Sequence, residues 1–148
     1  MTIHSSGERL GVEFVQAERV ESRAGQLIRV VVIDDEQSIV EGFCAILRMH
    51  GFEADGFTSP RAALRHLQDR AADMVVIDML MPEIDGIEVI ASIRRHHPAT
   101  RVVAMSGGGR WVSSGDCLSM AEGLGAHRTL EKPVQAATLV ETLRALVC

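Results

Sequence analysis

The chain has little cysteine. Its three cysteines, Cys44, Cys117 and Cys148, are odd in number and widely spaced in 148 residues, and they form no CxxC pair or Cys/His cluster. This pattern excludes a disulfide framework and a structural zinc site, and it predicts reduced thiols in a cytosolic protein. A chain of this length can bury a sizeable core without such cross-links.

Long apolar runs are also missing. No window approaches the roughly 18 apolar residues that a membrane span requires, and the first residues, MTIHSSGERLGVEFVQ, lack the basic and apolar regions of a signal peptide. The formal net charge is −5, and no basic stripe of the kind that binds nucleic acid stands out. We therefore expect a cytoplasmic protein with neither a membrane partner nor a direct nucleic-acid partner.

The composition is that of one soluble globular domain, with 47% hydrophobic and 24% charged residues. Residues 1–26 stand apart because they mix charges with a Ser/Gly-containing start, and we expect a flexible tail there. Leu10, Phe14 and Ala17 could form one face of a short helix within this tail. The expected division is a tail over 1–26 and a single domain over 27–148.

Short β-branched runs alternate with stretches of 3.6-residue periodicity from residue 26 onward. This alternation is typical of βα units on a parallel sheet. The first, third and fourth strands are almost continuously apolar, which predicts inner strands, while the second and fifth carry polar residues and suit the edges. The expected strands are residues 28–33, 52–57, 74–77, 102–105 and 126–130.

Five helices are expected to follow the strands. Ser59, with Pro60 after it, and Asp85 are the expected N-caps of the second and third helices, and Gly51 and Gly125 should end the first and fourth. The third helix must end before Pro98. The expected buried faces, in chain order, are Ile39/Phe43/Ile46/Leu47, Leu64/Leu67, Val89/Ile90/Ile93, Cys117/Met120/Ala121/Leu124 and Leu139/Leu143/Leu146.

Two inner strands end in carboxylates. Asp34 and Asp35 follow the first strand in VVIDD, and Asp78 ends the third in VVID. Right-handed crossovers make the strands parallel, so that their carboxyl ends share one edge of the sheet, where open α/β sheets bind ligands. Ser106 and Lys132 follow the fourth and fifth strands and are expected at the same edge.

Three adjacent carboxylates repel one another unless a cation lies among them. Oxygen ligands with few protein groups suit Mg²⁺. Together with the Lys132 ammonium and the Ser106 hydroxyl, such an ion would make a receptor for a phosphoryl group, with Asp78 as the covalent nucleophile.

Four motifs at the strand ends resemble those of a known family. They are DD at 34–35, DMLMPEIDG at 78–86, SGG at 106–108 and the dipeptide Lys132-Pro133. In this order they are similar to the receiver domain of bacterial two-component response regulators, the CheY-like fold, over residues 27–148. The resemblance implies a flavodoxin-like, doubly wound (βα)5 fold with a five-stranded parallel sheet in the order 2-1-3-4-5.

The resemblance also implies roles for the site residues. Asp78 would be the phosphoacceptor, and Ser106 and Lys132 would hold the phosphoryl oxygens, with a cis bond between Lys132 and Pro133. The implied Mg²⁺ ligands are Asp35 and Asp78 directly, Asp34 largely through water, and the backbone carbonyl of Leu80.

One position departs from the family pattern, and two others occupy positions whose residue type differs among family members. Thr129 stands where the family usually has Tyr or Phe as a switch, so the aromatic half of that relay is missing. Leu80 and Gly108 occupy positions that tune the access of hydrolytic water in the family. Residues 106–116 form a long glycine-rich connection that contains Trp111, which either contacts a partner or packs over the loop.

Two histidines stand at the end of the third expected helix. His96 and His97 are adjacent, so they point apart on a helix, which disfavours a metal pair. We interpret them as cations that favour a helix C-terminus rather than as metal ligands or a phosphohistidine.

The leading hypothesis is a stand-alone signalling module. It would accept a phosphoryl group from a histidine kinase or phosphotransfer protein, and then change its contacts with a downstream protein or with a second copy of itself. Only 15 residues follow Pro133, so we expect no DNA-binding output domain.

Two alternatives remain open at this point. One is a degenerate receiver that binds partners without phosphorylation, which the Thr129 departure keeps possible. The other is an aspartate-nucleophile Mg²⁺ phosphatase of the haloacid-dehalogenase type. Such enzymes need a second acid two residues after the nucleophile, where this chain has Leu80. We therefore expect no enzymatic activity beyond phosphorylation and dephosphorylation of Asp78 itself.

Overall fold

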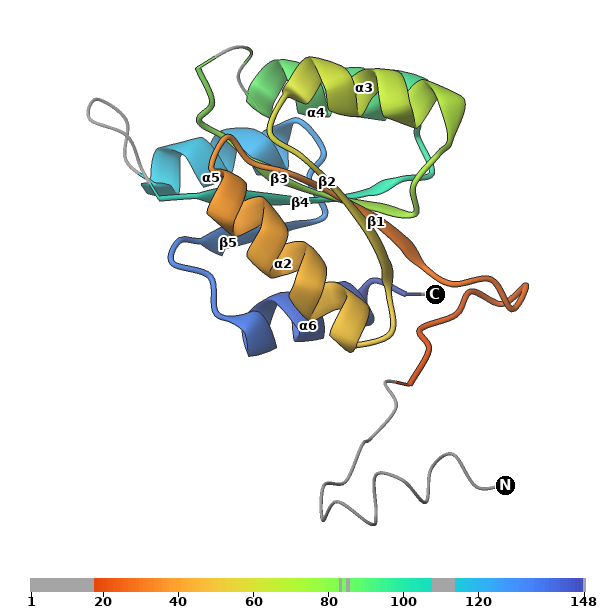
Figure 1. The fold of residues 1–148 in the computed structure, drawn as a ribbon. Helices are drawn as coiled ribbons and strands as arrows, with labels where there is room; N and C mark the ends of the chain where they lie inside the picture. The colour runs from red at the N-terminus through yellow and green to blue at the C-terminus, as the bar shows by residue number, and fades with distance from the viewer. Residues whose placement is uncertain (1–17, 83, 85, 108–113, 148) are drawn as a thin grey trace, which may run out of the picture.

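Strands and helices alternate along the whole domain (Figure 1). The computed structural model describes residues 18–82, 84, 86–107 and 114–147, and leaves the side chains of 114–118 undescribed. The elements are β1 (Arg29–Ile33), α2 (Gln37–Met49), β2 (Glu53–Phe57), α3 (Pro60–Asp69), β3 (Met74–Asp78), α4 (Gly86–His96), β4 (Arg101–Ser106), α5 (Ser114–Gly123), β5 (Arg128–Glu131) and α6 (Ala136–Ala145).

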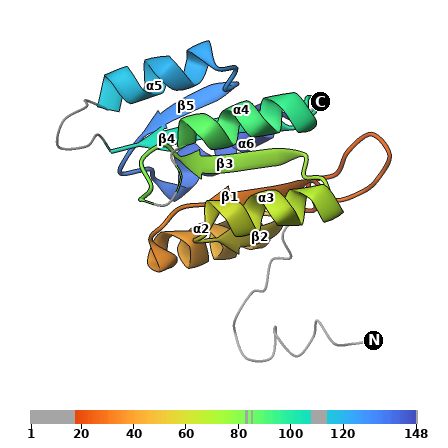
Figure 2. The same cartoon turned by 90° about the horizontal axis from the view of Figure 1, so that it is seen from above.

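The five strands form one parallel sheet in the order β2-β1-β3-β4-β5. This confirms the predicted fold class and strand order. Helices α2 and α6 cover one face of the sheet, and α3, α4 and α5 cover the other (Figures 1 and 2). The predicted edge strands are the least buried, because β2 and β5 contain exposed and half-buried residues while β1 and β3 are buried throughout.

The two faces have separate hydrophobic cores. Along β1, Val30 and Val32 pack in the core beneath α2 and α6, whereas Val31 and Ile33 pack in the core beneath α3, α4 and α5. Successive strand residues point to opposite faces, so a strand covered on both sides needs apolar residues at every position. This requirement explains why the two inner runs that end in aspartate look alike.

Most of the helix boundaries follow the predicted signals. The Ser59 hydroxyl caps α3 by accepting a hydrogen bond from the backbone N–H of Ala62 at 3.2 Å. Gly51 and Gly125 have φ values of +92° and +103°, as expected of the left-handed residue that ends a helix. The predicted cap Asp85 lies outside the described residues.

The predicted buried face of α2 was partly wrong. Val40, Cys44 and Leu47 are the buried residues, while Ile39, Phe43 and Ile46 are only half-buried. The reason is a close approach between α2 and β2: a Cβ atom on Gly56 would lie 2.2 Å from Val40 Cγ1 and 2.8 Å from Cys44 Sγ. The helix therefore turns its Val40 and Cys44 side toward the sheet.

The predicted face of α5 also needs one correction. Ala121 is fully buried and Leu124 is half-buried, but Met120 is 48% exposed. Small Ala121 lets the helix lie close to the sheet, which leaves the neighbouring Met120 on the outer side. The side chain of Cys117 lies outside the described residues. The predicted faces of α4 and α6 are confirmed, and in α3 Leu67 is buried while Leu64 is half-buried.

The segment just before β1 contacts the domain. Residues 18–27 turn back on themselves, with an antiparallel bridge between Glu21 and Leu27, and Val20 donates a backbone hydrogen bond to Gly51 O at 2.9 Å. The part of the predicted tail from residue 18 onward thus contacts the domain. The division at residue 26 stays a prediction, and Leu10, Phe14 and Ala17 lie outside the described residues.

One further property concerns membranes. In the part of the chain that the structure describes, no helix combines the length and the apolar character that crossing a bilayer requires.

Candidate functional site

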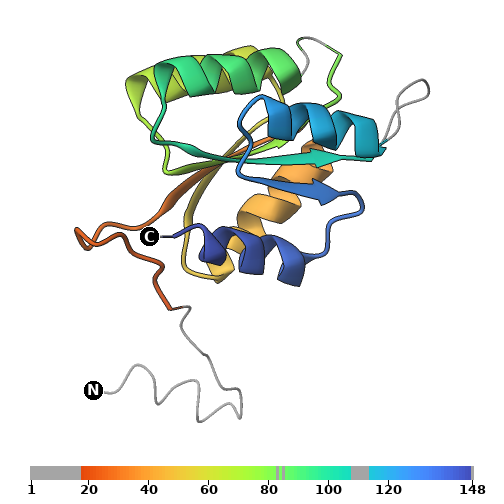
Figure 3. The same ribbon diagram turned by 180° about the vertical axis from the view of Figure 1, so that it is seen from behind.

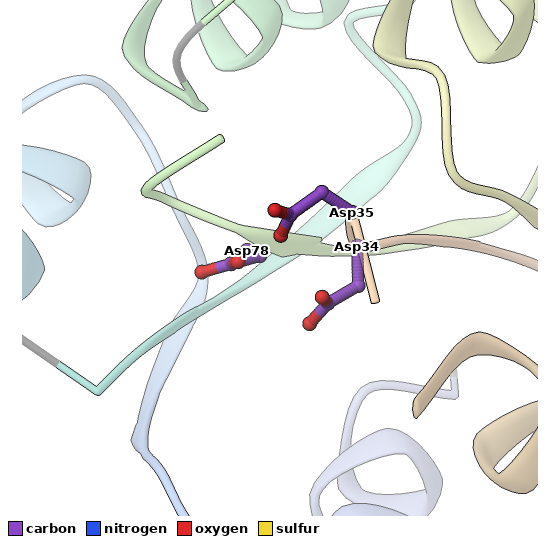
Figure 4. Close-up of side chains that lie close together, drawn as sticks. All are labelled: Asp34, Asp35 and Asp78. Atoms are coloured by element: carbon purple, nitrogen blue, oxygen red, sulfur yellow. The ribbon is translucent and has the colours of Figure 1, made fainter. Parts of the chain in front are cut away.

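The ends of β1 and β3 bring three carboxylates together. Asp34 and Asp35 directly follow β1 and Asp78 is the last residue of the adjacent strand β3. Oxygens of the three carboxylates lie within 4.8 Å of one another (Figure 4). Asp34 is fully buried and Asp78 is 5% exposed, whereas Asp35 is exposed. The predicted convergence of these acids at one edge is therefore observed.

Lys132 reaches the same cluster from the end of β5. Its Nζ lies 2.7 Å from Asp34 Oδ2 and 3.4 Å from Asp78 Oδ2. Its backbone N–H donates to Ser106 O at 3.0 Å, which ties the end of β5 to the buried last residue of β4. The Lys132-Pro133 bond is cis, as the resemblance implied.

The two buried aspartates are bound differently. Both Asp34 oxygens accept a hydrogen bond, Oδ1 from the backbone N–H of Glu36 at 3.0 Å and Oδ2 from Lys132. Asp78 Oδ1 accepts a longer bond, 3.3 Å, from the backbone N–H of Leu80, and its Oδ2 has the more distant contact with Lys132. Asp34 thus orients Lys132, and Asp78 is the buried acid with weaker bonds to the protein.

The turn after Asp78 is closely packed. The backbone N–H of Met79 donates to Met105 O, and Gly86 donates back to Met79 O. A Cβ atom on Gly86 would lie 2.6 Å from Met79 Cα and 3.0 Å from Asp78 O, so only glycine fits there. This turn fixes the backbone next to Asp78 and so positions its carboxylate.

The site holds less positive than negative charge. The pKa of Asp78 is raised to about 6, because the effects of burial and of the nearby Asp34 together outweigh the lowering by Lys132 and the Leu80 N–H. Burial lowers the pKa of Lys132, but its hydrogen bond to Asp34 and the charges of both aspartates outweigh this and raise it overall. One ammonium therefore does not neutralise three carboxylates, and the donor set fits a hard divalent cation such as Mg²⁺.

The strand order and the acids at the strand ends define an α/β domain of the receiver class. The family model described as response regulator receiver domain matches residues 30–144, and the chain belongs to this family. Receiver domains are signalling phosphoacceptors that bind Mg²⁺ at an acidic pocket and interact with histidine kinases or phosphotransfer proteins.

Solved structures agree with this assignment. A response regulator receiver domain protein from Clostridium thermocellum is 28% identical, with a TM-score of 0.75 over 82% of this chain and 94% of that chain. The beryllofluoride-activated NtrC4 receiver domain dimer is 30% identical, with a TM-score of 0.72 over 81% of this chain and 96% of that chain.

The curated relatives are longer proteins. The sensory transduction protein RegX3 of Mycobacterium tuberculosis is 31% identical over 120 residues, which are 80% of this chain and 50% of RegX3. The putative response regulator NtrX-like of Rickettsia bellii is 29% identical over 80% of this chain and 24% of its own length. The chain therefore spans half the length of these relatives or less.

Sequence reasoning missed an apolar hollow beside the site. It has a volume of about 400 Å³ and is lined by Ile39, Phe43, Lys132, Pro133 and Val134. The signal was present in the pattern of α2, because Ile39 and Phe43 are one turn apart and were assigned to the core. Gly108 and Trp111, which the sequence also singled out, lie outside the described residues.

Sequence reasoning also missed a charged network at the opposite end of β1. Arg29 is 4% exposed, and its guanidinium donates to the carbonyls of Arg70 and Ala71 at 2.9 and 2.7 Å. The sequence signal for this network was the presence of a cation, Arg29, inside the apolar run IRVVVI. The other partners of Arg29 are Glu53 and Asp55, each at 3.0 Å, His66, and Asp73, whose Oδ2 accepts the Arg29 backbone N–H at 2.8 Å.

Proposed function

We propose that this protein accepts a phosphoryl group on Asp78 from the phosphohistidine of a histidine kinase or phosphotransfer protein. The observation that carries the proposal is the contrast between the buried acids. Asp34 has both oxygens occupied, while Asp78 is buried beside Lys132 with weaker bonds to the protein. Asp35 is exposed, which leaves Asp78 as the acid best placed for covalent chemistry.

The proposed transfer is an in-line displacement at phosphorus. An Asp78 carboxylate oxygen forms the new P–O bond while the P–N bond to the donor imidazole breaks, and the imidazole keeps the electron pair and takes a proton from solvent. The Lys132 ammonium and the Ser106 hydroxyl would bind the transferred oxygens.

The proposed metal ligands are Asp34, Asp35, Asp78 and the backbone carbonyl of Leu80. Bound Mg²⁺ would supply charge neutralisation for the phosphoryl oxygens. The carboxylate cluster supports this role because its oxygens are hard donors and its negative charge is only partly balanced by Lys132.

The apolar hollow supports a docking role toward the phosphodonor. Lys132 lines both the hollow and the acid site, so the hollow, with Ile39 and Phe43, adjoins the place where a donor would bring phosphohistidine to Asp78. We propose that an apolar side chain of the donor fills this hollow. Such a contact would confer specificity without contributing to the chemistry.

The proposed output is a change of protein contacts. Thr129 is half-buried on β5 and pairs with Ala104 of β4, so that a small hydroxyl side chain stands where an aromatic switch is usual. We propose that the receiver domain acts in the cytoplasm. A downstream protein is one recipient of the signal, and homodimerisation, as in the activated NtrC4 receiver, is another.

The test is phosphorylation by acetyl phosphate, followed on phosphate-affinity gels in wild type, Asp78→Asn and the surface control Asp69→Asn. We expect a Mg²⁺-dependent, hydroxylamine-labile adduct in wild type and in the control, and none in Asp78→Asn. An unmodified wild type would support the degenerate receiver instead. Rapid multiple turnover of unrelated phosphoesters would support the phosphatase.

A further inference from the structure

Basic side chains gather at the amino ends of β4 and β5. The three carboxylates lie at the opposite, carboxyl ends of the strands. Residues 94–101 read RRHHPATR and residues 127–128 read HR, with no carboxylate among them, in a chain of net charge −5. These segments lead into β4 and β5, whose starts lie on the same side of the molecule (Figure 3). The "basic edge" is defined as Arg94, Arg101, His127 and Arg128, together with the exposed Arg95 that follows Arg94 in α4.

Backbone pairing holds the two segments together. The backbone N–H of His127 donates to Val102 O at 2.8 Å, and the Val102 N–H donates to His127 Nδ1 at 3.0 Å. Nδ1 therefore accepts a hydrogen bond and carries no proton. The pKa of His127 is lowered first by burial and then by the charges of Arg94, Arg101 and Arg128, in keeping with three guanidinium groups around one ring.

Hydrogen bonds to carbonyls fix two of these guanidinium groups without neutralising them. Arg94 Nη1 donates to Pro98 O and Thr100 O, each at 3.1 Å, and Arg128 Nη1 donates to His127 O at 2.7 Å. In the described part of the chain, Arg94, Arg95 and Arg128 form no ion pair with a carboxylate.

One acid on the same side of the sheet, Asp73, is already occupied. Asp73 lies in the loop before β3, and its backbone carbonyl accepts from Arg101 N at 2.9 Å. Its carboxylate instead accepts the backbone N–H of Arg29. This acid is therefore bound to β1 and does not screen Arg94 or Arg128 through an ion pair.

We propose that the basic edge docks an acidic segment of a partner protein. Guanidinium groups held by carbonyls keep further N–H donors for carboxylates, which they bind in a planar, bidentate way. Nucleic acid is the less suitable polyanion, because its continuous phosphate backbone would extend beyond these few basic side chains over the rest of a chain of net charge −5, whereas a short acidic segment would not. The edge lies across the sheet from Asp78, so such docking would be independent of phosphoryl transfer.

The test compares two double charge reversals that change net charge equally. Arg95→Glu with Arg128→Glu alters the basic edge, and Arg65→Glu with Arg144→Glu alters exposed residues of α3 and α6. The probe is a fluorescein-labelled peptide of alternating glutamate and glycine, followed by anisotropy at low ionic strength. We expect the basic-edge variant to bind about tenfold more weakly, and the control to stay within about twofold of wild type.

Several results would overturn the proposal. They are the absence of peptide binding by the wild type at low ionic strength, an equal loss in both variants, or tighter binding of a duplex DNA that competes for the same edge. Thermal melts establish that both variants are folded. Both variants should still be phosphorylated at Asp78, so failure of this proposal and failure of the phosphoacceptor proposal give different results.

Discussion

Each end of β1 buries a charged side chain, but the two charges differ in how far the protein balances them. At the amino end, the Arg29 guanidinium and backbone have partners on β2, α3 and the loop before β3. At the carboxyl end, three carboxylates lie together and the Lys132 ammonium contacts two of them, Asp34 and Asp78. The protein itself supplies the partners of the buried cation at the amino end. At the carboxyl end, negative charge is left unbalanced.

The difference separates a structural charge from a functional one. A buried ion that the protein surrounds with its own ion-pair and hydrogen-bond partners stabilises one arrangement of the chain. A buried acid whose pKa is raised, as for Asp78, is stabilised further when a cation or a phosphoryl group and its counter-ion arrive. Both ends look alike in burial, and only the partners distinguish them.

The largest expected effect is at the amino end. Replacing Arg29 by Met leaves Glu53 and Asp55 without their buried cation. We expect a loss of about 3 to 5 kcal/mol in the free energy of unfolding. Urea denaturation followed by circular dichroism measures it. A loss below about 1 kcal/mol would show that the network is not structural.

The next largest change in the free energy of unfolding is a gain, and it is expected at the carboxyl end of the sheet. The folded pKa of Asp78, about 6, lies above its ordinary value of 3.8, so its contribution to stability is complete below the ordinary value and is lost as pH rises through the folded pKa. Asp78→Asn should therefore stabilise the metal-free protein at neutral pH, by about 1 to 3 kcal/mol. Urea denaturation at neutral and acidic pH should show the gain shrinking toward zero below the ordinary pKa, and a pH-independent gain would contradict this origin.

A smaller effect concerns Mg²⁺ itself. At about tenfold excess over its dissociation constant, Mg²⁺ should raise the stability of wild type by about 1.4 kcal/mol. Asp35→Asn should reduce this gain because it removes an exposed ligand, and the surface control Asp69→Asn should keep it. Thermal melts with and without Mg²⁺ measure the difference, and an equal response in both variants would exclude Asp35 from the metal site.

The smallest effect is at the rim of the Arg29 network. Arg70 contacts Glu53 at 2.9 Å, but its side chain is 60% exposed. We expect Arg70→Met to change the free energy of unfolding by less than about 1 kcal/mol, because water screens the pair. A loss as large as that of Arg29→Met would erase the distinction between the centre of the network and its rim.

The sequence predicted the carboxyl end of β1 better than the amino end. Asp34, Asp35 and Asp78 stand directly after apolar runs, and parallel strands bring such positions to one edge by topology alone. Arg29 depends on residues of β2, α3 and a loop, and no local pattern indicates that they meet. The face of α2 was misjudged for a related reason, since the close approach at Gly56 is a tertiary contact.

The most direct test of the account is to locate the phosphorylated residue. After treatment with acetyl phosphate and Mg²⁺, borohydride reduction converts an aspartyl phosphate to homoserine, which mass spectrometry assigns to one position. The account predicts homoserine at residue 78 and unmodified aspartate at residues 34 and 35. Modification at either of those two residues, with residue 78 unmodified, would contradict it.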